Sequence, residues 1–131
     1  MSTQTNKEIV HALLDAHFKL DRQRVGEILS PKLVWHMSGM AKPMSREDYL
    51  QGLEMGAQSF SDMKHTIDAT VAEGDRVVVL SRVRMRHTGA FQGIAPSHRE
   101  LEFPQMWMYR VVDRKVVEAW AFHEDITARL R

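Results

Sequence analysis

The chain has 131 residues, 44% of them hydrophobic and 27% charged, with a formal net charge of +1 at pH 7. This length suits one domain, and the near-neutral charge argues against nucleic acid or an anionic membrane as the main partner. The chain has no cysteine, which excludes disulfides, thiolate metal ligands and cysteine nucleophiles. The N-terminal residues lack the pattern of a secretory signal, and no window approaches a membrane span. We therefore expect a single soluble domain over residues 1–131, located in the cytoplasm.

The first half of the chain carries mainly helical patterns. A helix is predicted over residues 5–18, where T-x-x-E resembles a capping box and apolar residues follow at helical spacing, with His17 among them. A second, shorter helix is predicted over residues 22–29. Residues 33–37 (LVWHM) resemble a short strand, and a third helix is expected from the S-x-x-D motif at residue 45 to about residue 59.

From residue 64 onward the hydrophobic period changes from 3.6 to 2, which is typical of strands. Strands are predicted over residues 64–73, 76–89, 100–112 and 115–124, with a two-residue turn at Asp113-Arg114 between the last two. Helices followed by antiparallel strands indicate an α+β fold, with the helices packed on one face of a curved sheet. The concave side of such a sheet can become a pocket.

The last two strands predict which side chains share that pocket. With a two-residue turn, Val112 pairs with Lys115, and directly paired residues lie on the same face. One face then combines large aromatic side chains with a few polar groups, as small-molecule pockets do; it carries Phe103, Gln105, Trp107, Tyr109, Trp120, Phe122 and Glu124. The other face is flatter and predicts a homodimer packed through the sheet; it carries Met106, Met108, Ala119, Ala121 and His123. A bulge would invert part of this assignment.

The sequence HED at residues 123–125 offers three ionisable groups. On the predicted register Glu124 is partly desolvated, which raises the pKa of a carboxylate and suits it to proton transfer near neutral pH. Asp125 lies where it can cap a final helical turn or act as the acid/base itself. His123 is predicted to point away from the pocket.

Two further histidines are candidates for the site. His87 continues the inward face of its strand, either as a core histidine hydrogen-bonded to the backbone or as a group that binds substrate. His36 lies on a short strand whose faces the sequence does not distinguish. No HxH or HExxH spacing supports a metal site and no phosphate-binding loop is present, so we expect no metal and no other cofactor.

Four motifs stand out along the second half of the chain: FSDMKHTIDATVAEGDRV, HTGAFQGIAPSHRELEF, QMWMYRVVDRKVVEAW and the terminal HED. Together they resemble the SnoaL-like polyketide cyclase family, within the nuclear transport factor 2-like superfamily. The resemblance implies an α+β cone with a pocket between helices and sheet. It also implies an acid/base carboxylate at Glu124 or Asp125, assisted by His36 and Gln105. His98, Arg114 and Trp107 depart from the family's usual pattern.

These observations together predict a cofactor-independent acid/base enzyme acting on a small apolar or aromatic carbonyl compound. Aldol-type ring closure is the favoured reaction. An isomerase, a dehydratase or a non-catalytic binder with the same pocket are the alternatives. The predicted catalytic residues are Glu124, Asp125 and His36, and the predicted substrate contacts are Phe103, Gln105, Trp107, Tyr109, Trp120 and His87.

Overall fold

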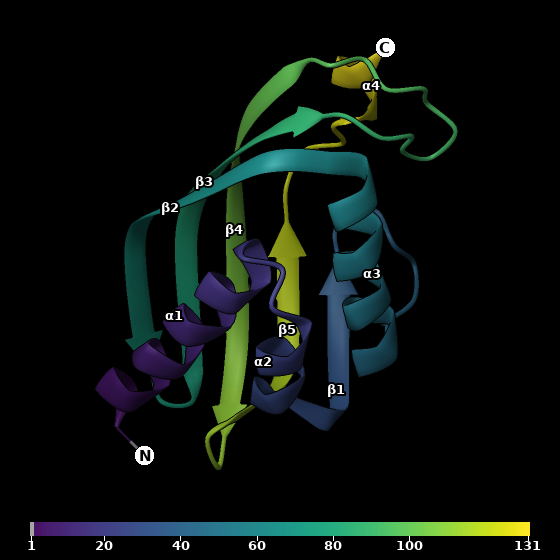
Figure 1. Cartoon of the computed structure of the whole chain (residues 1–131). Coiled ribbons are helices and arrows are strands. Elements are labelled where there is room, and N and C mark those ends of the chain that lie inside the picture. The colour runs from purple at the N-terminus through teal and green to yellow at the C-terminus, as the bar shows by residue number, and fades with distance from the viewer. Residues whose placement is uncertain (1) are drawn as a thin grey trace.

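The computed structural model describes residues 2–131 as a layer of helices on a five-stranded sheet (Figure 1). The helices are α1 (Thr3–Phe18), α2 (Arg22–Ile28), α3 (Arg46–Ser59) and α4 (Thr127–Leu130). The strands are β1 (Leu29–Met37), β2 (Phe60–Glu73), β3 (Arg76–His87), β4 (Glu100–Val112) and β5 (Lys115–Phe122). Their order is β1-β5-β4-β3-β2, with β1 parallel to β5 and the other neighbours antiparallel. The predicted α+β class is confirmed.

Side-chain caps determine where α1 and α3 begin. The Ser2 hydroxyl accepts a hydrogen bond from the Thr5 N–H at 3.0 Å, so α1 starts two residues before the predicted capping box. At α3 the predicted box is present. The Ser45 hydroxyl accepts from the Asp48 N–H at 3.2 Å, and the Asp48 carboxylate accepts from the Ser45 N–H at 2.8 Å. Each cap satisfies N–H groups that have no partner within their helix.

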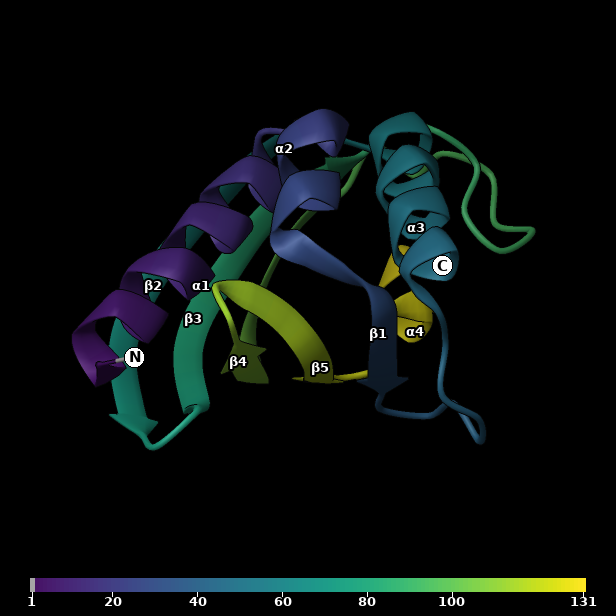
Figure 2. The ribbon, with the colours of Figure 1, turned by 90° about the horizontal axis from the view of Figure 1, so that it is seen from below.

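Irregular pairing curves the sheet around the helices. The register between β2 and β3 shifts twice, between Ser61 and Lys64 and again between Ile67 and Ala69. Bulges bend the strand that carries them, and β2 turns across the end of the sheet to meet α3 (Figure 1). Seen from below in Figure 2, α1, α2 and α3 lie together on the concave side of the sheet. This curvature leaves room between the two layers.

The hairpin between β4 and β5 begins as predicted. Asp113 and Arg114 have φ angles of +49° and +65°, and Val112 pairs with Lys115. Positive φ at both central residues is what a two-residue type I′ turn requires.

Three residues into β5 the register slips by one. Val111 pairs with Val116, but Arg110 pairs with Glu118, so Val117 is an extra residue without a counterpart in β4. The strand therefore carries a bulge, and every residue from Glu118 onward lies on the face opposite to the predicted one.

The bulge corrects the predicted faces of the sheet. The concave face carries Phe103, Gln105, Trp107, Tyr109, Ala119 and Ala121, all buried. The outer face carries Met106, Met108, Glu118, Trp120 and Phe122. The predicted pairing of Trp120 and Phe122 with the pocket residues is therefore wrong, as is the placement of the two alanines on the outer face.

The buried side chains form two clusters that meet beneath the helices. The larger cluster lies under α1 and α2 and includes Leu13, Leu14 and Trp107. The smaller one gathers Phe60 and Phe103 near α4, together with Ile126 and Leu130. Within residues 2–131 no helix is both long and apolar enough to cross a membrane.

Candidate active site

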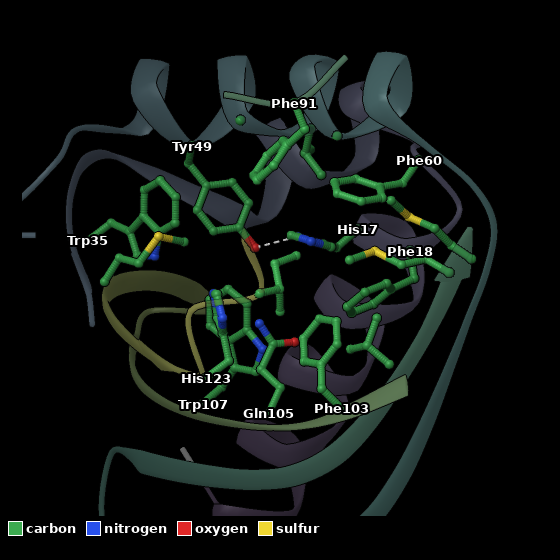
Figure 3. Close-up of a pocket in the computed structure, with 18 residues that line it drawn as sticks. His17, Phe18, Trp35, Tyr49, Phe60, Phe91, Phe103, Gln105, Trp107 and His123 are labelled. Carbon is green, nitrogen blue, oxygen red and sulfur yellow. Dashed lines mark hydrogen bonds between the residues drawn. The ribbon is translucent and has the colours of Figure 1, made fainter. Parts of the chain in front are cut away.

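An apolar cavity of about 200 Å³ lies where the two clusters meet (Figure 3). Its wall consists mainly of aromatic and methionine side chains: Phe18, Trp35, Met37, Phe60, Met63, Met85, Phe91, Phe103 and Trp107. Four side chains supply polar groups: His17, Tyr49, Gln105 and His123. An engineered cavity of about 150 Å³ in another protein holds one benzene molecule. The present cavity therefore suits a ligand of about one ring, with flexible methionines that can adjust its shape.

His123 lies at the boundary between this cavity and an outer hollow of about 440 Å³. We call the outer hollow the vestibule; residues 37–40, 91–92 and 123–127 line it. The Nδ1 atom of His123 is 2.7 Å from the backbone carbonyl oxygen of Glu124. Because a carbonyl oxygen only accepts hydrogen bonds, Nδ1 carries the hydrogen, and in the neutral ring Nε2 keeps a free lone pair.

His17 and Tyr49 form a hydrogen-bonded pair between α1 and α3. The Nδ1 atom of His17 lies 2.7 Å from the Tyr49 hydroxyl oxygen, and Tyr49 is 1% exposed. Burial, with a smaller contribution from nearby His65, lowers the pKa of His17 to about 4. Burial raises the pKa of Tyr49 above its ordinary value. Both members of the pair are therefore uncharged near neutral pH.

Gln105 projects from β4 toward the cavity, between Phe103 and Trp107 (Figure 3). Its side-chain oxygen is buried and has no hydrogen-bond partner among residues 2–131, and the same holds for the indole nitrogens of Trp35 and Trp107. Buried polar atoms without partners are rare and costly. Phe103, Gln105 and Trp107 thus line the cavity as predicted, while Tyr109 stacks behind Trp107 with ring centres 5.4 Å apart.

The two carboxylates of the HED sequence line the vestibule, and each is bound by a residue close to it in sequence. Glu124 forms an ion pair with Arg129 at 2.9 Å, and its side chain is 43% exposed. The prediction that it lies inside the cavity is wrong, because the bulge turns His123 inward in its place. Asp125 accepts hydrogen bonds from the Thr127 hydroxyl at 2.7 Å and the Thr127 N–H at 3.0 Å, which lower the pKa of Asp125. Asp125 therefore forms a local turn with Thr127 just before α4. The N-cap position belongs to Ile126, which has no side-chain cap bond, so the predicted N-cap role of Asp125 is wrong.

Three other predicted site residues, His36, His87 and Trp120, lie outside the cavity lining. His36 is on the outer face of the sheet, where its Nε2 lies 2.8 Å from the Glu118 carboxylate and its ring stacks on Trp120. His87 is fully buried, and its Nδ1 accepts a hydrogen bond from the Ser97 N–H at 3.1 Å. Of the two predicted alternatives, His87 is therefore the core histidine hydrogen-bonded to the backbone, and not a group that binds substrate. Contacts of these side chains with a ligand in the cavity are therefore not supported.

His17 and Tyr49 were not predicted as site residues. His17 follows Val10, Leu13 and Leu14 at helical spacing, so a polar residue on the buried face of α1 was the available signal. Tyr49 occupies an equivalent buried position on α3, but nothing in the sequence brings the two residues together. Within the described residues no group of three metal-binding side chains is positioned to hold an ion.

A helical layer over a curved sheet, enclosing an apolar cavity with a few polar groups, defines a nuclear transport factor 2-like fold. The chain is also placed within one family of that class. A family model described as SnoaL-like polyketide cyclase matches residues 7–129, and the chain belongs to this family. No match was found among curated proteins.

Solved structures agree with this placement. IdmH of Streptomyces antibioticus, a proposed polyketide cyclase, has 28% sequence identity and a TM-score of 0.81, over 93% of this chain and 94% of that one. AclR of Streptomyces galilaeus, a proposed hydroxylase, has 26% identity and a TM-score of 0.86, over 98% of this chain and 80% of that one. A proposed SnoaL-like polyketide cyclase from Jannaschia sp. CCS1 has 22% identity and a TM-score of 0.87, over 97% and 90%. At that identity the last similarity supports the fold alone.

Proposed function

We propose that this protein is an acid/base enzyme that removes a proton from the carbon beside the carbonyl group of a small, largely apolar compound. The observation that carries this proposal is the fixed orientation of His123. Its Nδ1–H is held by the Glu124 carbonyl at 2.7 Å, and its ring lines an apolar cavity of about 200 Å³. A neutral imidazole with one free lone pair beside a bound carbonyl compound is a suitable general base.

The proposed chemistry requires no group beyond the side chains of the cavity. The Nε2 atom of His123 accepts the proton, and the electron pair of the broken C–H bond moves to the carbonyl oxygen as an enolate. In an aldol reaction the enolate carbon then attacks a second carbonyl carbon, whose oxygen takes the proton back from His123. A low-polarity cavity strengthens each hydrogen bond made to the developing charge.

Aldol-type ring closure is the form of this reaction that we favour. Membership of the SnoaL-like polyketide cyclase family supports it, and so does the similarity to IdmH, a proposed polyketide cyclase. Isomerisation and dehydration begin with the same proton abstraction, and the volume of the cavity favours a one-ring substrate for all three reactions.

The test is exchange of α-hydrogens for deuterium, measured by proton NMR in D₂O with cyclohexanone and acetophenone as probes. We expect the protein to accelerate exchange and the His123→Asn variant to lose about 10²–10⁴-fold of that rate, the usual contribution of a general base. Asparagine can still donate to the Glu124 carbonyl but cannot act as the base. His36→Asn is the matched control, because His36 lies on the outer face of the sheet, and its rate should be unchanged.

Two results would contradict the proposal. One is exchange that is equally fast with and without His123. The other is binding of both ketones, detected by tryptophan fluorescence, with no exchange above the uncatalysed rate. The second result would favour a ligand-binding protein without catalytic activity.

A further inference from the structure

We propose that Tyr49 and His17 form an oxyanion-binding pair, which holds the oxygen of an enolate-like or phenolate-like ligand of about one ring. Tyr49 would contact that oxygen, and His17 would position the Tyr49 hydroxyl. The binding site stands on its own geometry, while its use in turnover rests on the proposed function.

The pair of His17 and Tyr49 has a hydrogen-bond donor available for a ligand. The two residues are 2.7 Å apart, and a neutral imidazole carries one N–H. If that hydrogen is on Nδ1, it is donated to the Tyr49 oxygen, and the tyrosine O–H can donate to a ligand. The neighbouring Tyr109 hydroxyl has no hydrogen-bond partner among residues 2–131, so it does not take this donor. An oxyanion beside Tyr49 favours this tautomer over the alternative, in which Tyr49 donates to Nδ1 and the Nε2–H is free. Both side chains line the cavity.

Both side chains of the pair are uncharged near neutral pH. Burial keeps both groups uncharged, since it lowers the pKa of His17 to about 4 and raises that of Tyr49. The pair thus acts as a donor and does not compete as a base. A neutral donor in a largely apolar cavity favours an oxyanion strongly, because a hydrogen bond to a charge is stronger in surroundings of low dielectric.

The pair lies across the cavity from the proposed base. Tyr49 and His17 come from the helical layer, whereas His123 and Gln105 come from the sheet side of the cavity (Figure 3). A one-ring ligand held between these walls meets a proton acceptor on one side and a proton donor on the other. This is the arrangement that enolate formation requires, since negative charge develops on the oxygen while the proton leaves from carbon.

The test uses 4-nitrophenolate as a one-ring oxyanion and nitrobenzene as an uncharged ring of similar size. Dissociation constants are measured by tryptophan fluorescence at a pH where 4-nitrophenol is ionised. The Tyr49→Phe variant keeps the ring and removes the hydroxyl. We expect this variant to raise the dissociation constant for 4-nitrophenolate about 10-fold to 100-fold, the usual effect of losing a hydrogen bond to a charged group. The dissociation constant for nitrobenzene should be unchanged.

His36→Asn is the control, because His36 lies on the outer face of the sheet and outside the cavity lining, whereas Tyr109 adjoins the Tyr49 hydroxyl and would not be independent of it. The His36→Asn variant should alter neither dissociation constant. His17→Gln provides a second, independent variant, and it should reduce the preference for 4-nitrophenolate over nitrobenzene, because Tyr49 loses its orienting partner. A purely structural role of the pair would weaken both probes together.

The proposal is overturned if Tyr49→Phe leaves 4-nitrophenolate binding intact, if it weakens both probes equally, or if the unmodified protein binds neither probe. Failure of the proposed function looks different. His123→Asn should retain the preference for 4-nitrophenolate while losing deuterium exchange. If the protein binds the phenolate in preference to nitrobenzene but never catalyses exchange, the oxyanion-binding pair is supported and the proposed enzymatic function is refuted.

Discussion

Acidification from pH 7 to pH 5 is expected to destabilise the protein through His17. The pKa of this residue is about 4 in the folded protein against 6.5 for an ordinary histidine. The unfolded chain therefore binds more protons than the folded one between pH 4 and pH 6.5, and stability falls as the pH is lowered through that interval. From these two values the loss between pH 7 and pH 5 is about 2 kcal/mol for His17 alone.

His65 acts in the same direction, because burial also lowers its pKa to about 4. The two losses do not simply add, since His65 is itself one cause of the lowered pKa of His17. The two carboxylates with shifted pKa values do not interfere in this range. Asp68 and Asp125 have lowered pKa values, so their contributions are present above pH 3.8 and disappear only below it.

The assay is urea unfolding followed by tryptophan fluorescence at pH 7 and pH 5, with His17→Gln beside the unmodified protein. Glutamine keeps a hydrogen-bonding group near Tyr49 but does not titrate. The variant should lose about 2 kcal/mol of pH dependence, whatever its stability at pH 7. An identical pH dependence in both proteins would refute the assignment of His17 as a buried, neutral residue.

Three further predictions concern other parts of the molecule. Gly89→Ala should cost about 2 kcal/mol or more, because a Cβ there would lie 1.9 Å from the Gln58 carbonyl oxygen, and chemical denaturation will measure the loss. The protein should be a homodimer through the outer face of the sheet, where Met106 and Phe122 are 44% and 52% exposed. Light scattering should show a dimer that the Phe122→Glu substitution converts to monomers. A monomeric unmodified protein would contradict this prediction. Asp125→Asn should cost at most about 1 kcal/mol on denaturation, because the asparagine oxygen can accept the same hydrogen bonds from Thr127, and a larger loss would assign Asp125 another role.

Much of the fold could be predicted because periodicity and turn chemistry are local properties. The capping box at Ser45, the turn at Asp113-Arg114 and the alternating pattern of β3 are each encoded within a few residues. The bulge at Val117 is not encoded in this way. The run Val116-Val117 is apolar throughout, and either register leaves a plausible alternation of side chains.

The site was harder to predict for two physical reasons. A slip of one residue exchanges the faces of a strand, so the bulge brought His123 into the cavity in place of Glu124. The pairing of His17 with Tyr49 joins residues 32 positions apart on two helices, and it depends on how those helices pack. The faces of the β4 residues were predicted correctly because that strand lies before the bulge, but Tyr109, a predicted substrate contact, lies outside the cavity lining.

The order of the strands also has a consequence for synthesis of the chain. β5 lies between β1 and β4 in the sheet, although every other strand precedes it in sequence. Until about residue 122 has left the ribosome, β1 has no strand partner and one edge of β4 stays open. Unpaired edges of this kind are templates for contact with other chains. We therefore expect the nascent protein to be most prone to contact with other chains just before its sheet is completed.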